Sequence, residues 1–203
     1  MARLPKIQLD WWKDPKGYHL AEAGMRVVRN GRGDKLELTR PLDSPDTFRI
    51  FATTATTPEG LLRFVQSYGP LTILGNDQGD LVPDIIRRAQ IMRDTLKFLS
   101  DQSEQRRLRE IGANLHLSFF LQAWIDFNPI TNSLQWQFRA ASLLDGLWLQ
   151  LGQAVTRGVH IRACAHCADL FEAGLGTGRR LDAKFCSDEH RIAFNSLKRS
   201  KEK

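Results

Sequence analysis

All three cysteines of the chain lie in one C-terminal stretch that runs from Cys164 to His190. Cys164 and Cys167 form a C-x2-C pair, and Cys186 and His190 form a C-x3-H pair after eighteen intervening residues. Structural zinc is bound tetrahedrally by thiolate and imidazole groups, which such short pairs supply. The spacing therefore predicts a Zn2+ site with the ligands Cys164, Cys167, Cys186 and His190.

The fourth ligand has a second candidate, His166, which lies between the first two cysteines. His190 follows Cys186 by four positions, so the two side chains would share one face of a helix. We expect His190 to complete the site, with competition from His166 as the alternative. Four protein ligands leave no coordination position for water, so we expect this zinc to be structural and not catalytic.

The two ligand pairs need different local structures to reach one metal ion. Two residues between Cys164 and Cys167 fit a tight turn, or knuckle, in a β-hairpin. Ser187 is a favourable helix N-cap, and the acidic residues after it favour the first turn of a helix. We therefore expect a treble-clef-like arrangement with three parts: the knuckle, a loop with Gly174, Gly176 and Gly178, and a helix from about Ser187 to Lys198.

This stretch resembles the CGNR-type zinc finger of bacterial proteins over residues 160–200. The residues that carry the resemblance are Cys164, Cys167, Leu170-Phe171, Arg179-Arg180, Phe185-Cys186-Ser187 and the ligand at 190. The chain lacks the Gly-Asn-Arg part of that motif and has Arg191-Ile192-Ala193 after His190. The resemblance implies metal ligation by the three cysteines, with His190 in place of the last Cys. It also implies a mainly helical N-terminal domain and a role in transcription regulation.

Basic residues exceed acidic ones, and the excess is concentrated near the C-terminus. The chain has a net charge of +6, and from Arg157 to Lys203 it has ten Lys or Arg against six Asp or Glu. Such a region favours contact with phosphates, although it is also compatible with a solubilising tail. We expect a nucleic-acid-binding surface, for DNA more than for RNA, formed by Arg179, Arg180, Lys184, Arg191, Lys198 and Arg199.

The rest of the chain predicts an α+β fold, with a mainly helical domain over residues 1–158 and the zinc finger over 159–203. Alternation and the Asn30-Gly31 dipeptide predict a hairpin from Met25 to Leu42. We interpret Arg32-Gly33-Asp34 as turn residues. A further strand is expected at Phe48–Ala52, and a second hairpin between Phe119 and Phe138.

Three helices are expected from their apolar spacing. Thr57 and Pro58 should begin the first, which Gly69-Pro70 should end. In the second, from Pro83 to about Ile111, apolar residues recur every three or four positions. Ser142 should begin the third, which ends at Gly158. Residues 75–79 are expected to form a loop.

Several classes of function are disfavoured by what the sequence lacks. No apolar run approaches the 18 residues of a membrane span, and the N-terminus lacks the apolar core of a secretion signal, so we expect a cytoplasmic protein. We expect no enzymatic activity, because the carboxylates and histidines form no catalytic pattern. Candidates considered were Asp14, Asp77, Asp80 and Asp84, with His160 and Asn195 for a nuclease. A protein-interaction module stapled by zinc is the alternative to nucleic-acid binding.

Overall fold

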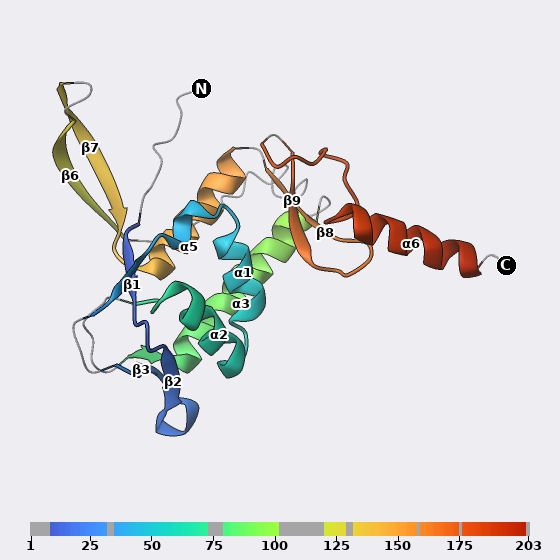
Figure 1. Cartoon of the computed structure of the whole chain (residues 1–203). Coiled ribbons are helices and arrows are strands. Elements are labelled where there is room, and N and C mark those ends of the chain that lie inside the picture. Colours follow the sequence, from blue (N-terminus) through green and yellow to red (C-terminus); the bar gives the residue numbers. More distant parts are fainter. Residues whose placement is uncertain are drawn as a thin grey trace. The chain divides into compact units, whose positions relative to one another are not determined.

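The computed structural model describes residues 9–31, 35–72, 79–101, 120–128, 132–157, 159–174 and 176–201. Its fold is α+β, as predicted, with small antiparallel sheets and a C-terminal helix that follows the Cys/His cluster (Figure 1). Contacts divide the chain into two compact units, residues 1–91 with 117–152 and residues 92–116 with 153–203. No helix in the described ranges is both long and apolar enough to cross a membrane. The predicted domain boundary at residue 158 stays a prediction.

The first unit contains two small antiparallel sheets near its N-terminus. In one, β1 pairs with β4, and in the other β3 lies between β2 and β5. The strands are β1 (Trp11–Lys13), β2 (Tyr18–Ala21), β3 (Arg26–Arg29), β4 (Glu37–Thr39) and β5 (Asp80–Leu81). A 3-10 turn, η1 (Glu22–Gly24), connects β2 to β3, and a second, η2 (Pro41–Asp43), follows β4.

The predicted hairpin from Met25 to Leu42 is wrong in its pairing, although both strands exist. β3 pairs with β2 and β5, whereas β4 pairs with β1. Gly31 allows a close contact here, because a Cβ atom at this position would lie 2.5 Å from Asp14 Oδ2. Arg32-Gly33-Asp34 and most of the predicted loop at 75–79 lie outside the described residues.

The strand predicted at Phe48–Ala52 is also wrong, since these residues belong to helix α1 (Thr47–Thr54). Phe48, Phe51 and Ala52 are all fully buried, at the spacing of one helical face. Five residues are too few to separate this spacing from the alternation of a strand. The start of α1 is hydrogen-bonded to helix α5 (Leu143–Thr156), which lies far along the chain. The Gln150 side chain accepts a hydrogen bond from the Phe48 N–H at 3.1 Å and donates one to the Ser44 carbonyl at 2.6 Å.

Helix α2 (Pro58–Tyr68) begins and ends as predicted. The Thr57 hydroxyl accepts a hydrogen bond from the Gly60 N–H at 3.1 Å, and Gly69 ends the helix with a φ of 94°. Gly60 has a packing role, because a Cβ atom there would clash with the Thr54 carbonyl oxygen. The turn between α1 and α2 therefore requires glycine at this position.

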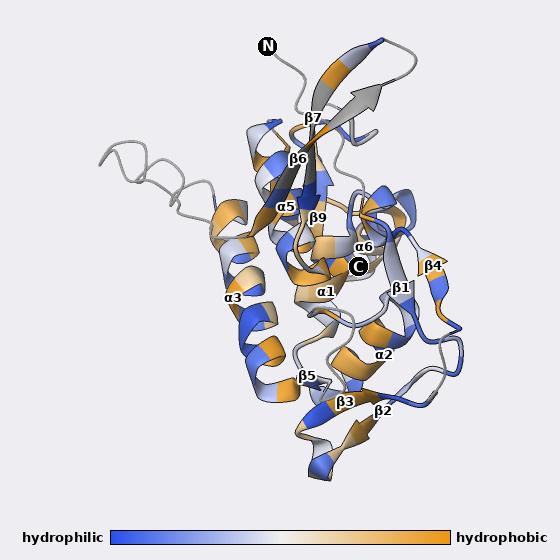
Figure 2. Ribbon diagram, turned by 90° about the vertical axis from the view of Figure 1, so that its left-hand side faces the viewer, coloured by the Kyte–Doolittle hydropathy of each residue, from blue (hydrophilic) through white to orange (hydrophobic). Residues whose placement is uncertain are grey.

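Helix α3 (Val82–Ser100) confirms the predicted apolar seam but not the predicted length. Its seam residues are all buried, and Figure 2 shows hydrophobic and hydrophilic positions alternating along it; they are Ile85, Ala89, Met92, Leu96 and Leu99. The helix ends at Ser100, with Asp101 outside it. The remainder of the predicted helix, residues 102–111, lies outside the described residues.

The second predicted hairpin is confirmed as β6 (Leu121–Asn128) paired with β7 (Ser133–Ala140). The helix predicted from Ser142 is α5, which ends at Thr156; Gly158 lies outside the described residues. The Ser142 hydroxyl accepts from the Asp145 N–H at 3.1 Å and donates to its carboxylate at 2.6 Å. This reciprocal cap fixes the start of α5, whose apolar face is largely buried.

Two buried carboxylates hold loops of the first unit together. Asp14 accepts from the Lys16 and Gly31 N–H groups, both at 2.8 Å. Asp80 accepts from the Leu71 N–H at 2.7 Å and from the Thr72 N–H at 3.0 Å. These bonds give both side chains a structural role, since buried backbone N–H groups must be paired. Asp77, another of the carboxylates considered, lies outside the described residues.

We expect Asp80→Ala to lower the free energy of unfolding by about 2–4 kcal/mol, because two N–H groups at a buried site would lose their acceptor. The measurement is urea denaturation followed by tryptophan fluorescence. Asp84→Ala is the matched control. The Asp84 side chain is exposed in the first turn of α3, so its loss should change stability by less than about 1 kcal/mol. Equal effects of the two substitutions would contradict this role for Asp80.

Candidate metal centre

The Cys/His cluster is built from a β-hairpin and the helix that follows it in the second unit. The hairpin pairs β8 (His160–Ala163) with β9 (Leu170–Ala173), and the helix is α6 (Asp188–Lys201). This order of knuckle, loop and helix is the one predicted. The knuckle is closed by two backbone bonds of 2.9 Å, from the Cys164 N–H to the Asp169 carbonyl and from the Ala168 N–H to the Cys164 carbonyl.

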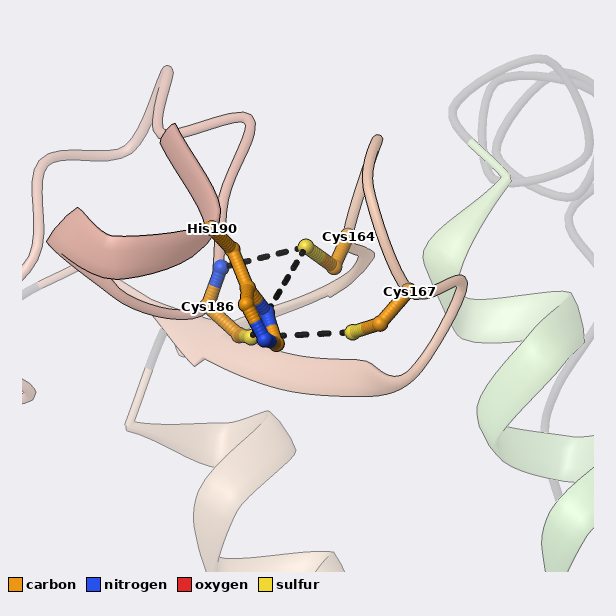
Figure 3. Close-up of side chains that lie close together, drawn as sticks. All are labelled: Cys164, Cys167, Cys186 and His190. Carbon is orange, nitrogen blue, oxygen red and sulfur yellow. Dashed lines mark hydrogen bonds between the residues drawn. The ribbon is translucent and has the colours of Figure 1, made fainter. Parts of the chain in front are cut away.

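The second ligand pair lies at the start of α6. Cys186 precedes the helix, and His190 lies in its first turn. The Ser187 hydroxyl accepts from the His190 N–H at 3.2 Å, so Ser187 caps the helix as predicted. This cap fixes the direction in which α6 leaves the loop, and thereby places His190 over the knuckle (Figure 3).

The structure brings the four predicted ligands together. One potential ligand atom from each of Cys164, Cys167, Cys186 and His190 lies within 4.8 Å of all the others (Figure 3). In a tetrahedral zinc site, two sulfur atoms would lie about 3.8 Å apart, and sulfur and nitrogen about 3.5 Å apart. The Sγ atoms of Cys167 and Cys186 lie 3.7 Å apart, and Cys164 Sγ lies 3.9 Å from His190 Nδ1.

One distance is shorter than a tetrahedral site would have. Cys186 Sγ and His190 Nδ1 lie 2.9 Å apart, at hydrogen-bonding distance. Metal binding would lengthen this separation by about 0.6 Å, which a small rotation of the imidazole can supply. The donor set and its geometry therefore fit a metal ion that prefers thiolate and imidazole ligands.

A small apolar core supports the cluster from within the module. Cys164, Phe171 and Ala173 are buried, and partly buried hydrophobic residues pack against them; these are Cys167, Ala183, Phe185 and Cys186. Three of these seven residues are proposed ligands. A core this small contributes little stability without cross-links or a metal. Phe171 and Phe185 are among the residues that carry the resemblance to the CGNR-type finger.

Backbone hydrogen bonds favour a thiolate at Cys164. The His166 and Cys186 N–H groups both donate to Cys164 Sγ at 3.5 Å. Burial raises the pKa of Cys164, but hydrogen bonds from the N–H groups of Cys167, Cys186 and His166 outweigh it and lower the pKa to about 6. Cys164 is therefore prepared as a metal ligand at neutral pH.

The other two thiols are shifted in the opposite direction. Burial raises the pKa of Cys167 to about 12, and it raises the pKa of Cys186 as well. The neighbouring Cys164 sulfur adds to both shifts, because one negative charge in the cluster opposes the formation of a second. A metal ion must therefore displace the protons of Cys167 and Cys186 when it binds.

His166 does not belong to the group of ligand atoms, although it lies close to it. Its ring centroid lies 4.9 Å from that of His190. The group found within the described residues contains His190 and not His166. The geometry therefore favours His190 as the fourth ligand.

The six basic residues predicted to bind nucleic acid all belong to the same module. Arg179, Arg180 and Lys184 lie on the loop between β9 and α6, and the other three lie on α6; these are Arg191, Lys198 and Arg199. Arg179 also has a structural contact that the sequence did not indicate: its guanidinium donates to the Cys186 carbonyl at 2.6 Å.

No family model matches the chain, and neither does any curated protein or solved structure. The fold and the site therefore define the class: an α+β protein with a C-terminal Cys3His group that can bind a metal ion. The CGNR-type finger remains a resemblance of residues 160–200.

Proposed function

We propose that the chain is a nucleic-acid-binding protein whose C-terminal module is held by a structural zinc ion. The Cys3His group supplies four ligands of the kinds that structural zinc prefers, and these leave no position for a substrate. The proposal includes a cytoplasmic location and no enzymatic activity. It also includes a regulatory role like that attributed to the bacterial CGNR-type proteins.

The observation that carries this proposal is that the last turns of α6 are exposed and basic. Every residue from Asn195 to Ser200 is exposed, and the helix extends beyond the hairpin of its own module (Figure 1). A helix of this length is only marginally stable in water without packing or a partner. Its last two turns contain basic residues and no acidic ones. A polyanion is therefore a suitable partner.

The spacing of the basic residues on α6 suits a track of phosphates. Arg191 and Lys198 are seven residues apart, which places them on the same face of the helix. At 1.5 Å per residue they are separated by about 10 Å along the helix axis. Two phosphate contacts could thus form on one side of α6.

We expect the affinity for duplex DNA to fall steeply as salt rises, because each phosphate contact releases counterions. Arg191→Ala with Lys198→Ala should reduce the slope of log K against log salt by about 2. Fluorescence anisotropy with a labelled duplex at several salt concentrations measures this. The control is Lys97→Ala on α3, outside the proposed surface, which should leave the slope unchanged. Binding that is absent, or insensitive to salt, would contradict the proposal.

A protein partner is the second candidate, because α6 also exposes apolar residues. Ile192 and Leu197 are 64% and 56% exposed, and exposed apolar side chains on a helix can contact a protein partner. A pull-down that recovers one protein after nuclease treatment, and that loses it on Ile192→Ser with Leu197→Ser, would favour this candidate over nucleic acid.

A further inference from the structure

A hollow lies beside the metal ligands at the start of α6. It has a volume of about 550 Å³ and is formed by the loop before α6 together with the first turn of the helix. Four of its lining side chains are basic and two are acidic; they are Arg179, Arg180, Lys184, Arg191, Asp182 and Asp188. The lining therefore has an excess of positive charge, which favours an anion.

Arg179 is held in place before any ligand binds. Its guanidinium donates to the Cys186 carbonyl at 2.6 Å, and its central carbon lies 5.8 Å from the centre of the Phe171 ring. A guanidinium has five N–H donors, so this contact leaves others available. A donor that is already fixed loses less conformational entropy when it binds an anion.

Of the other three cations, Arg180 and Arg191 form exposed ion pairs that a bound anion can replace at little cost. Arg180 pairs with Asp182 at 3.1 Å, but both side chains are largely exposed, at 88% and 72%. Arg191 pairs with Asp188 at 3.2 Å and is also exposed. Such surface pairs contribute little energy. The Lys184 side chain forms no ion pair within the described part of the chain.

The hollow is connected to the metal ligands through the backbone. The Ala165 N–H in the knuckle donates to the Lys184 carbonyl at 2.9 Å, and Cys186 accepts the bond from Arg179. The positions of the loop cations thus depend on the Cys3His cluster. We propose that this hollow is a binding site for a phosphate group, assembled by the folded metal module. The proposal deepens the nucleic-acid function and rests on it for the source of the phosphate.

NMR spectra of the full chain test this site at constant ionic strength. The probes are inorganic phosphate, a dinucleotide with a single phosphodiester and no terminal phosphate, and chloride as the reference anion. We expect both phosphate probes to shift the amide signals of residues 176–191 with a dissociation constant of about 1 mM, and chloride to leave them unchanged. A response to the dinucleotide assigns the site to a nucleic-acid backbone, and a response to inorganic phosphate alone assigns it to a free phosphate or monoester.

Substitutions of the basic and of the acidic lining residues should change the affinity for phosphate in opposite directions. Arg180→Gln with Lys184→Gln should weaken phosphate binding about tenfold, whereas Asp182→Asn should strengthen it about threefold, because it removes a competing carboxylate. Arg93→Gln with Lys97→Gln, at two exposed positions of α3 outside the proposed surface, is the control and should leave phosphate binding unchanged. Zinc content and circular dichroism check that each variant is folded.

Failure of this inference can be distinguished from failure of the proposed function. Duplex binding that is lost with Lys198→Gln and Arg199→Gln, without any phosphate response in the hollow, would overturn the site and leave nucleic-acid binding intact. Equal shifts with chloride and phosphate would also overturn it. Phosphate binding that weakens in the Arg180/Lys184 variant would support the site even if the protein does not bind duplex DNA.

Discussion

Removal of the metal ion should unfold the hairpin and helix of the C-terminal module while the core of the first unit stays folded. The free energy of zinc binding in small zinc modules is about 10–16 kcal/mol, and most of it is folding free energy. The core that would remain consists of Cys164, Phe171 and Ala173 with a few partly buried neighbours. The first unit has its own core, which includes Phe48, Phe51, Leu61, Phe64 and Leu147.

The measurement combines chelation with far-ultraviolet circular dichroism. We expect one equivalent of zinc per chain, a loss of helical signal when a strong chelator is added, and its recovery at a one-to-one ratio of added zinc. Hydrogen exchange should show loss of protection over residues 159–201 with protection retained in α1 and α2. Less than about half an equivalent of zinc in purified protein, or no change on chelation, would contradict a structural site.

The two histidines provide a matched pair of variants for the same prediction. His190→Ala should weaken zinc binding by more than the roughly 10–100-fold that loss of an outer-shell group costs. His166→Ala should change it by less than that amount, since His166 is not among the grouped ligand atoms. Cys186→Ala should behave like His190→Ala. A larger effect at His166 than at His190 would show that His166 is the ligand.

The affinity for zinc should rise by about 100-fold for each pH unit between about pH 6.5 and 8. Metal ligands must be thiolates, and raised pKa values keep Cys167 and Cys186 protonated in this range without metal. Binding therefore releases two protons, so higher pH favours the bound state and lower pH opposes it. Cys164 releases none here, because its pKa is lowered to about 6.

Below about pH 6 the slope should become steeper, since Cys164 then also binds a proton in the metal-free protein. A competition titration against a chromophoric chelator measures the slope, after correction for protonation of the chelator. Cys164→Ser is the informative variant: it should weaken binding but keep the slope near two between pH 6.5 and 8. A slope near three for the unmodified chain in that range would contradict the assignment of Cys164 as the ready thiolate.

Helix starts could be predicted from local sequence, whereas the pairing of β3 and β4 could not. The helix starts predicted at Thr57-Pro58 and Ser142 are confirmed, because a cap depends on residues within one turn. The strand predicted at Phe48–Ala52 failed, since Phe48 and Phe51 are buried against distant residues that a five-residue pattern does not contain. Asn30-Gly31 likewise predicted a turn between β3 and β4, which pair with other strands.

The sequence by itself predicted which four residues form the Cys3His group, because they lie in two short pairs whose spacing favours a turn and a helical face. It also determined that positive charge would gather in the same module. Only the tertiary structure decided which strands pair, that Asp14 and Asp80 hold loops, and that Arg179, Arg180, Lys184 and Arg191 surround one hollow. These arrangements depend on contacts between residues separated along the chain, and such contacts form only when the backbone has folded back on itself.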